Sequence, residues 1–145
     1  MLKGILQSLF GSPPVREPFN DPLLGVLAPG ETGWTVKVVK GADKFEFTIG
    51  GISKPDDALL AHAHDILDDY QSFKKAVKGC VEYESRDYPE EVKAELAGLE
   101  IDNIALFWPA RPNDGMVFFR GSEKDVGLWR CDYTDRKPTG LGCDT

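Results

Sequence analysis

This chain of 145 residues has few of the residues that mark metal, redox and disulfide sites, with only three cysteines and two histidines. Cys80, Cys131 and Cys143 are an odd number and show no Cys-x-x-Cys spacing, which argues against a zinc knuckle and against a disulfide framework. Free thiols in a reducing compartment are the favoured interpretation, with a Cys131–Cys143 bridge as the alternative. We therefore expect a cytoplasmic protein without a metal or another cofactor.

Long hydrophobic runs are also missing, and no stretch approaches the roughly 20 apolar residues that a membrane-spanning helix needs. Residues 1–11 carry one lysine, a short apolar run and no A-x-A cleavage site, so we do not expect a signal peptide. Within them, apolar residues repeat at helical spacing, at Leu2, Ile5, Leu6 and Leu9. We expect residues 1–18 to form a short helix and a linker. The helix either packs on the rest of the chain or serves as a small docking or membrane-touching element.

Basic residues are in deficit, with 17 Lys and Arg against 24 Asp and Glu and a net charge of −7. A general nucleic-acid-binding protein needs a cationic surface, so this balance argues against nucleic acid as a partner. The charge is unevenly distributed, because residues 56–102 hold 13 of the acids and only five of the bases. The excess negative charge of the protein therefore lies in this central block.

The sequence contains no recognisable catalytic motif. His62 and His64 lie two positions apart, which on a helix places them about 200° apart and prevents them from sharing one metal ion. The sequence contains no G-x-S-x-G nucleophile elbow and no glycine-rich phosphate loop. We therefore expect no catalytic residues and no enzymatic activity.

A hydrophobic content of 41% is enough for a core, and its periodicity predicts where strands and helices lie. Alternation and turn signals predict strands over 23–27, 34–38, 45–49, 101–108, 116–120 and 126–133, and an irregular tail follows from Thr134. Between the two groups of strands, apolar residues recur at helical spacing from Leu59 to Val81, with Asp56 or Asp57 at the start. The pattern indicates one long helix or two with a bend near Gln71 and Ser72. A further short helix is expected over residues 90–96 before Gly98.

This order predicts an α+β fold over residues 19–145. We expect an antiparallel sheet of about six strands in βββ-ααα-βββ order, with the helices packed on one face. Strands and helices are segregated along the chain, which argues against a doubly wound parallel sheet.

The acidic side chains of the helical block are the first candidate site. Asp65, Asp68 and Asp69 are expected on or beside the helix face opposite Ile66 and Tyr70. Such a face either keeps the protein soluble or steers a basic protein partner toward it. The candidate partner-binding acids are Asp56, Asp57, Asp65, Asp68, Asp69, Glu82, Glu84 and Asp87.

A second candidate lies where the fourth predicted strand ends at Trp108 and enters a hairpin loop with Arg111. Tryptophan and arginine near a loop are frequent anchors of protein interfaces. The alternation of Ile104 and Leu106 continues to Trp108, however, and favours a core position for this tryptophan.

Two further hypotheses use other parts of the chain. A small-ligand-binding protein or an enzyme could form its site under the sheet from residues distant in sequence, with His62, Tyr70, Arg120 and Arg130 as members. Alternatively, the chain could associate with itself through the helical stripe or through residues 1–10.

The opening Phe19-Asn20-Asp21-Pro22-Leu23-Leu24-Gly25-Val26-Leu27, with Trp34 and Phe45-x-Phe47-x-Ile49, resembles small bacterial domains of unknown function. The ending Trp129-Arg130-Cys131-Asp132-Tyr133 with Gly140-Leu141-Gly142 fits the same kind of sequence. Some of these acidic domains are similar to immunity proteins encoded beside polymorphic toxins. The resemblance spans roughly residues 19–144 and implies a cytoplasmic protein that binds and blocks a cognate toxin, without catalytic residues.

Overall fold

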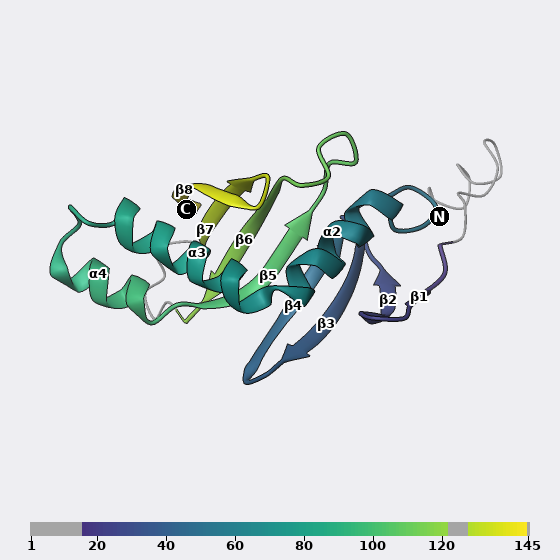
Figure 1. Ribbon diagram of the computed structural model, residues 1–145, viewed down its shortest axis with the longest axis horizontal. Coiled ribbons are helices and arrows are strands. Elements are labelled where there is room, and N and C mark those ends of the chain that lie inside the picture. Colours follow the sequence, from purple (N-terminus) through teal and green to yellow (C-terminus); the bar gives the residue numbers. More distant parts are fainter. Residues whose placement is uncertain (1–15, 122–127, 145) are drawn as a thin grey trace, which may run out of the picture.

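The computed structural model describes residues 16–121 and 128–144 (Figure 1). The described chain begins with four strands, which are β1 (Phe19–Asp21), β2 (Gly25–Pro29), β3 (Trp34–Lys40) and β4 (Asp43–Ile49). Three helices follow, α2 (Asp57–Asp68), α3 (Tyr70–Glu84) and α4 (Glu90–Ala97). The last four strands are β5 (Glu100–Leu106), β6 (Gly115–Arg120), β7 (Leu128–Thr134) and β8 (Lys137–Asp144).

The eight strands form one mixed sheet in which each strand lies beside its neighbour in sequence. Every pair is antiparallel except β4 and β5, which are parallel because the chain crosses over through the three helices between them. The prediction of an α+β fold is confirmed. The predicted six antiparallel strands are wrong in number and in the direction of this central pair, and the observed order is ββββ-ααα-ββββ.

The two additional strands lie at the edges of the sheet, where the sequence signals are weakest. Asn20, Asp21 and Pro22 are turn formers in the sequence, yet Asn20 and Asp21 pair with β2. The turn follows them, and the Asp21 carboxylate accepts hydrogen bonds there from the backbone N–H groups of Leu23 and Leu24. The tail that we expected to be irregular is β8, which pairs with β7 along its length and contains Pro138. An edge strand tolerates proline because one of its sides makes no ladder hydrogen bonds.

The hairpin of β3 and β4 confirms the predicted alternation. Trp34 lies opposite Ile49, Val36 opposite Phe47, and Val38 opposite Phe45. These six side chains are buried on the face that the helices cover (Figure 1), whereas Lys37 and Lys44 are exposed. The pleat therefore places one face of the hairpin in the core and the other in water.

The predicted helical stripe is buried, as its spacing indicated, at Leu59, Ala63, Ile66, Tyr70, Phe73, Val77 and Val81. The stripe runs through two helices, since α2 ends at Asp68 and α3 begins at Tyr70, with Asp69 between them close to the predicted bend. α2 contacts β4, and α3 contacts β7 and β8, so the two helices cover different parts of the sheet.

Gly98 follows α4 as predicted. None of the helices in the described residues has the length and apolar character for a membrane crossing.

Candidate functional site

The end of α2 carries three neighbouring carboxylates, Asp65, Asp68 and Asp69, which we call the α2 carboxylate cluster. All three side chains are exposed, whereas Ile66 and Tyr70 between and beside them are buried, as the helical spacing predicted. No side chain in the described part of the chain forms an ion pair with any member of the cluster. Their charge therefore faces solvent without a direct ion pair to any described residue.

The two acids at the start of α2 have a different role. The Asp56 carboxylate accepts hydrogen bonds from the backbone N–H groups of Ala58 and Leu59, at 3.0 and 3.1 Å. Asp56 is therefore the N-cap of α2, as its position indicated. Asp57 is exposed and forms an ion pair of 3.2 Å with Lys54. Of the predicted binding acids, Asp56 serves the helix itself.

Glu82, Glu84 and Asp87 lie at the other end of α3, and all are exposed. The helical rise of 1.5 Å per residue places Glu82 about 20 Å from Asp69 along α3. The lysines of α3, Lys74, Lys75 and Lys78, lie between these two groups of acids. Charges separated by more than the Debye length of about 8 Å at physiological salt act largely independently. The acidic helical block therefore consists of two separate patches.

The loop between β5 and β6 exposes Trp108, with 36% of its surface accessible. The expectation of a core position for this tryptophan is wrong, because β5 ends at Leu106 and a turn follows in which the Arg111 N–H donates to the Trp108 carbonyl. The Arg111 guanidinium lies 5.2 Å from the centroid of the Trp108 ring, in cation–π geometry. Both side chains line a shallow pocket of about 230 Å³ together with Arg130 and Asp132.

The turn between β7 and β8 connects this loop with the α2 carboxylate cluster. Its backbone N–H groups bind the loop, with Arg136 N donating to the Asn113 carbonyl at 3.2 Å and Asp135 N donating to Asp114 Oδ1 at 3.4 Å. The same turn borders a second pocket, of about 250 Å³, whose walls include Asp65, Asp69, Asp135, Arg136 and Lys137. The two candidate sites are therefore parts of one continuous surface. We call it the α2–turn–loop surface and define it by Asp65, Asp68, Asp69, Asp135, Arg136, Trp108 and Arg111.

Sequence reasoning missed the turn because it lies in the tail that we expected to be irregular. Asp135 and Arg136 have φ angles of 51° and 62°, which is the left-handed region. Two such residues in succession are typical of the tight hairpin turns whose twist matches that of the strands. The same turns usually contain Asn-Gly or Asp-Gly, because a side chain other than glycine costs roughly 1–2 kcal/mol in this conformation. Asp135-Arg136-Lys137 lacks that glycine, so the local sequence did not indicate a turn.

Behind this surface, His62 and Tyr133 are both buried and form a hydrogen bond of 2.9 Å. Burial, and then the positive charge of Arg136, lowers the pKa of His62 to about 4, although Asp65 and Asp114 oppose the shift. His64 lies on another side of α2 and donates to the Asp21 carboxylate at 2.8 Å. Burial opposes the ionisation of Asp21, but hydrogen bonds from the Leu24 backbone and from His64 keep its pKa below the usual value. The two histidines thus serve separate structural contacts.

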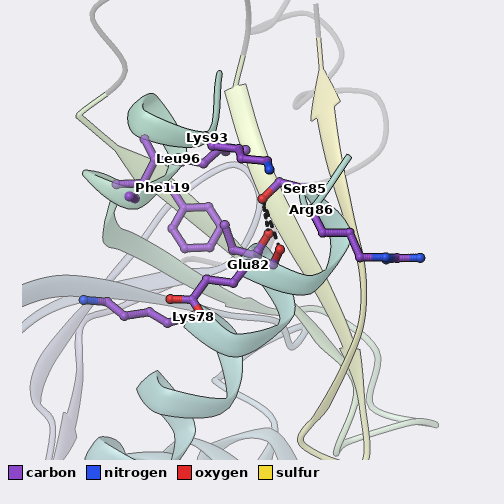
Figure 2. Close-up of a pocket in the computed structure, with 10 residues that line it drawn as sticks. Lys78, Glu82, Ser85, Arg86, Lys93, Leu96 and Phe119 are labelled. Atoms are coloured by element: carbon purple, nitrogen blue, oxygen red, sulfur yellow. Dashed lines mark hydrogen bonds between the residues drawn. The ribbon is translucent and has the colours of Figure 1, made fainter. Parts of the chain in front are cut away.

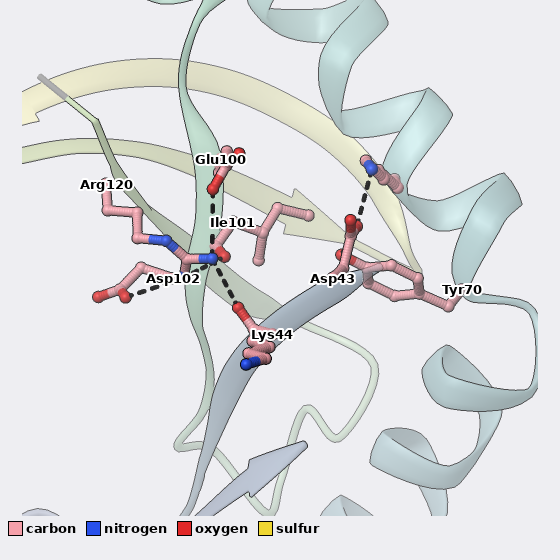
Figure 3. Close-up of polar contacts among 8 residues, drawn as sticks. Asp43, Lys44, Tyr70, Glu100, Ile101, Asp102 and Arg120 are labelled. Carbon is pink, nitrogen blue, oxygen red and sulfur yellow. Dashed lines mark hydrogen bonds and ion pairs between the residues drawn. The ribbon is translucent and has the colours of Figure 1, made fainter. Parts of the chain in front are cut away.

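The four residues of the alternative ligand site make separate contacts. His62 binds Tyr133, and Arg130 lies near Asp132 at 3.3 Å. Figure 3 shows the other two on different sides of β4. The Tyr70 hydroxyl donates to Asp43 at 2.8 Å, and Arg120 donates to the carbonyls of Ile101 and Lys44 and contacts the carboxylates of Glu100 and Asp102.

The cysteines are the remaining side chains with ligand chemistry. Cys80 and Cys131 are free thiols that lie close together, and burial raises the pKa of both. Within residues 16–121 and 128–144, no three His, Cys, Asp or Glu side chains are grouped so that they could hold a metal ion.

Comparison with protein-family models, with curated proteins and with solved structures finds no match for this chain. The resemblance to immunity proteins therefore stays a prediction from the sequence, and the geometry of the α2–turn–loop surface is the basis for a function.

Proposed function

We propose that this protein is a non-enzymatic inhibitor of the immunity type, which binds a cognate basic toxin domain in the cytoplasm through the α2–turn–loop surface. The exposure of Asp65, Asp68 and Asp69, without an ion-pair partner in the described residues, is the observation that carries this proposal. A basic partner would supply ion-pair partners, which Arg136 and Lys137 do not provide although they border the same pocket as Asp65 and Asp69.

The position of the cluster adds support, because it is unfavourable for the helix itself. Asp65 and Asp68 lie in the last turn of α2, where the helix dipole is negative and where no basic residue compensates. They are also three positions apart, so their like charges repel along the helix. Each effect costs a few tenths of a kcal/mol in a surface helix. Charges that weaken their own helix fit a role in recognition better than a role in folding.

Trp108, Arg111 and the turn supply the remaining properties of an interface. Trp108 and Arg111 belong to the residue types that dominate binding energy at protein interfaces, and the cation–π contact holds them together at the surface. The two left-handed residues of the turn, Asp135 and Arg136, store backbone strain, which is typical of functional segments. The acids would steer the partner, and Trp108 and Arg111 would anchor it.

The test is affinity capture from a lysate of the source organism at low salt, followed by elution with salt and identification by mass spectrometry. Asp68→Lys with Asp69→Lys is the test variant. Glu90→Lys with Glu91→Lys, which reverses two exposed acids of α4, is the matched control. We expect the wild-type protein and the control to capture one basic protein that the test variant loses, and we expect the wild-type protein to inhibit the activity of the captured protein.

Association kinetics with the captured protein complete the test. At low salt, the two charge reversals should slow association about tenfold while changing dissociation less, because steering acts on the encounter rate. Equal association rates for the test variant, the control and the wild-type protein, or rates that do not depend on salt, would show that the α2 carboxylate cluster is not the binding surface.

A further inference from the structure

A cleft between α3 and α4 lies away from the α2–turn–loop surface and has a different character (Figure 2). Its volume of about 510 Å³ is within the range of 300–1,000 Å³ that is usual for small-molecule sites. The floor is apolar and consists of Val81 from α3, Leu96 and Leu99 from α4 and the residues after it, and Phe119 from β6. These four side chains are buried against the core, so the floor is preformed.

The rim of the cleft is basic in a part of the chain that is otherwise strongly acidic. Three of the five bases in residues 56–102 line it, Lys78, Arg86 and Lys93, together with one acid, Glu82. Figure 2 shows the Arg86 side chain pointing away from the cleft, and its guanidinium lies 4.0 Å from the centre of the Tyr83 ring. The Lys93 ammonium ends beside Ser85, whereas the Lys78 side chain extends toward the opposite side of the cleft (Figure 2). Lys93 is therefore the cation nearest to Ser85, and Lys78 adds positive charge from the other side.

These two lysines hold few contacts that would compete with a ligand. Among the described residues, Lys78 forms neither an ion pair nor a side-chain hydrogen bond, and Lys93 contacts only the exposed carboxylate of Glu90, at 3.5 Å. Such an exposed pair contributes less than about 1 kcal/mol and is easily exchanged. Ser85 adds a fixed polar group, since it is buried and its hydroxyl donates to the Val81 carbonyl at 2.6 Å, which leaves the oxygen able to accept a hydrogen bond.

We propose that the cleft between α3 and α4 binds a small amphipathic carboxylate, with its apolar body on Val81, Leu96, Leu99 and Phe119 and its carboxylate at the Lys93 ammonium beside Ser85. Lys78 favours the negative charge from the other side of the cleft. The apolar floor supplies most of the affinity through burial of ligand surface. The ammonium groups select for a negative head group, because a carboxylate gains a charge-assisted hydrogen bond with Lys93 that a neutral head group does not. This site does not depend on the proposed inhibitor function.

The probes are three small molecules that separate the two parts of the proposal. Decanoate carries both the apolar body and the carboxylate, decanol carries the body with a neutral head group, and acetate carries the charge alone. Binding is followed by chemical-shift changes of the backbone amides in two-dimensional NMR, at ligand concentrations below micelle formation. We expect decanoate to shift the amides of Lys78, Ser85, Leu99 and Phe119 in a saturable way, decanol to bind about tenfold more weakly, and acetate to leave them unchanged.

Two variants and one control test the residues that line the cleft. Lys78→Met with Lys93→Met removes both charges and keeps the length of the side chains, and it should weaken decanoate about tenfold without affecting decanol. Lys37→Met with Lys40→Met, at two exposed positions of β3, makes the same change of net charge and should leave decanoate binding as in the wild-type protein. Ala97→Trp places a large side chain at an exposed position that lines the cleft. It should abolish binding of both decanoate and decanol, while thermal unfolding checks that each variant is folded.

The proposal is wrong if decanoate does not shift the amides around the cleft at concentrations that saturate an ordinary apolar site. It is also wrong if decanol binds as tightly as decanoate, or if both lysine pairs weaken decanoate equally. Loss of toxin binding in Asp68→Lys with Asp69→Lys has no bearing on these outcomes, so failure of one proposal is distinguishable from failure of the other.

Discussion

His62 Nε2 lies 2.9 Å from the hydroxyl oxygen of Tyr133, although the two residues are 71 positions apart in the chain. Both side chains are 2% exposed, and Phe73 packs edge-on against the Tyr133 ring. The pair joins α2 to β7 through the middle of the core. Burial holds the pKa of His62 at about 4 and raises the pKa of Tyr133 above its usual value, so both groups are neutral at physiological pH.

The neutral state of His62 predicts a pH dependence of stability. In the unfolded chain the histidine has a pKa near 6.5, whereas in the folded protein its pKa is about 4. As the pH falls from about 6.5 to about 4, the unfolded state takes up a proton that the folded state does not, so the free energy of unfolding decreases, by up to about 3 kcal/mol. Asp21 contributes only below this window, because its folded pKa lies below that of a free aspartate.

Denaturant unfolding at intervals across this pH range measures the effect. His62→Gln keeps a polar side chain without the titration, so its curve should be flatter than that of the wild-type protein over the same window. A wild-type stability that is constant across the window, or an equal slope in the variant, would contradict the assignment to His62.

Gly115 leaves the space in which the Tyr133 hydroxyl lies. A Cβ atom at this position would be 2.5 Å from that hydroxyl oxygen and 2.9 Å from the Ala105 carbonyl oxygen. To make room for it, the buried Tyr133 ring or the backbone of β5 would have to move. We expect Gly115→Ala to lower the free energy of unfolding by about 1–3 kcal/mol, as overpacking does in other cores. Gly79→Ala is the matched control, because its Cβ would meet no atom within 4 Å in the middle of α3. This change should stabilise the protein by about 0.5–1 kcal/mol. Thermal and denaturant unfolding measure both effects, and equal effects of the two substitutions would refute this explanation.

Asp56 and Asp57 are adjacent acids with different structural roles. Asp56→Ala removes the cap of two backbone N–H groups at the start of α2 and should cost about 1 kcal/mol of stability. Asp57→Ala removes only an exposed ion pair with Lys54 and should change stability by less than about 0.5 kcal/mol. Denaturant midpoints of the two variants provide the comparison. A larger loss for Asp57→Ala would mean that the first turn of α2 is held by charge and not by the cap.

Arg120 binds both β4 and β5 at the end where these parallel strands are not yet paired with each other. The ladder between β4 and β5 begins at Glu46 and Asn103, and before this point the Arg120 guanidinium donates to the carbonyls of Lys44 and Ile101, at 2.8 and 3.0 Å (Figure 3). Arg120→Met should therefore cost about 1–2 kcal/mol, since these strand carbonyls lose their donors. Lys44→Met removes the same charge from an exposed side chain and should be nearly neutral. Hydrogen exchange at the start of β4 should accelerate in Arg120→Met alone, and unchanged exchange would show that the guanidinium does not hold this end.

The local pattern of the sequence was informative where the chain is regular and half-buried. The alternation from Trp34 to Ile49 predicted the β3–β4 hairpin and its buried face, and the spacing from Leu59 to Val81 predicted the helical stripe. Asp56 and Gly98 marked helix ends through their capping chemistry. The exposure of Asp65 and Asp68 followed from the same helical period. Each of these features depends on neighbours within a few positions.

Other features required partners far along the chain. Pro138, Gly140 and Gly142 weaken any local strand signal, and β8 forms because β7 offers a complete edge for pairing. Nothing near Glu46 or Asn103 indicates that β4 and β5 run parallel, since this direction results from the crossover of three helices. Trp108 continues an apolar alternation, yet the strand ends before it and leaves its ring at the surface.

The amino-acid sequence alone set the fold class, the two groups of secondary structure and the concentration of negative charge in the helical block, because periodicity and charge are properties of short segments. The tertiary structure decided how those charges are grouped. It separated the acids of α2 from those at the end of α3 by about 20 Å of helix, and it joined Asp65 and Asp69 to Trp108 and Arg111 through the turn at Asp135 and Arg136. It also gathered Lys78 and Lys93 above an apolar floor that includes Phe119. Contacts of this range depend on the packing of helices on the sheet, which no local pattern encodes.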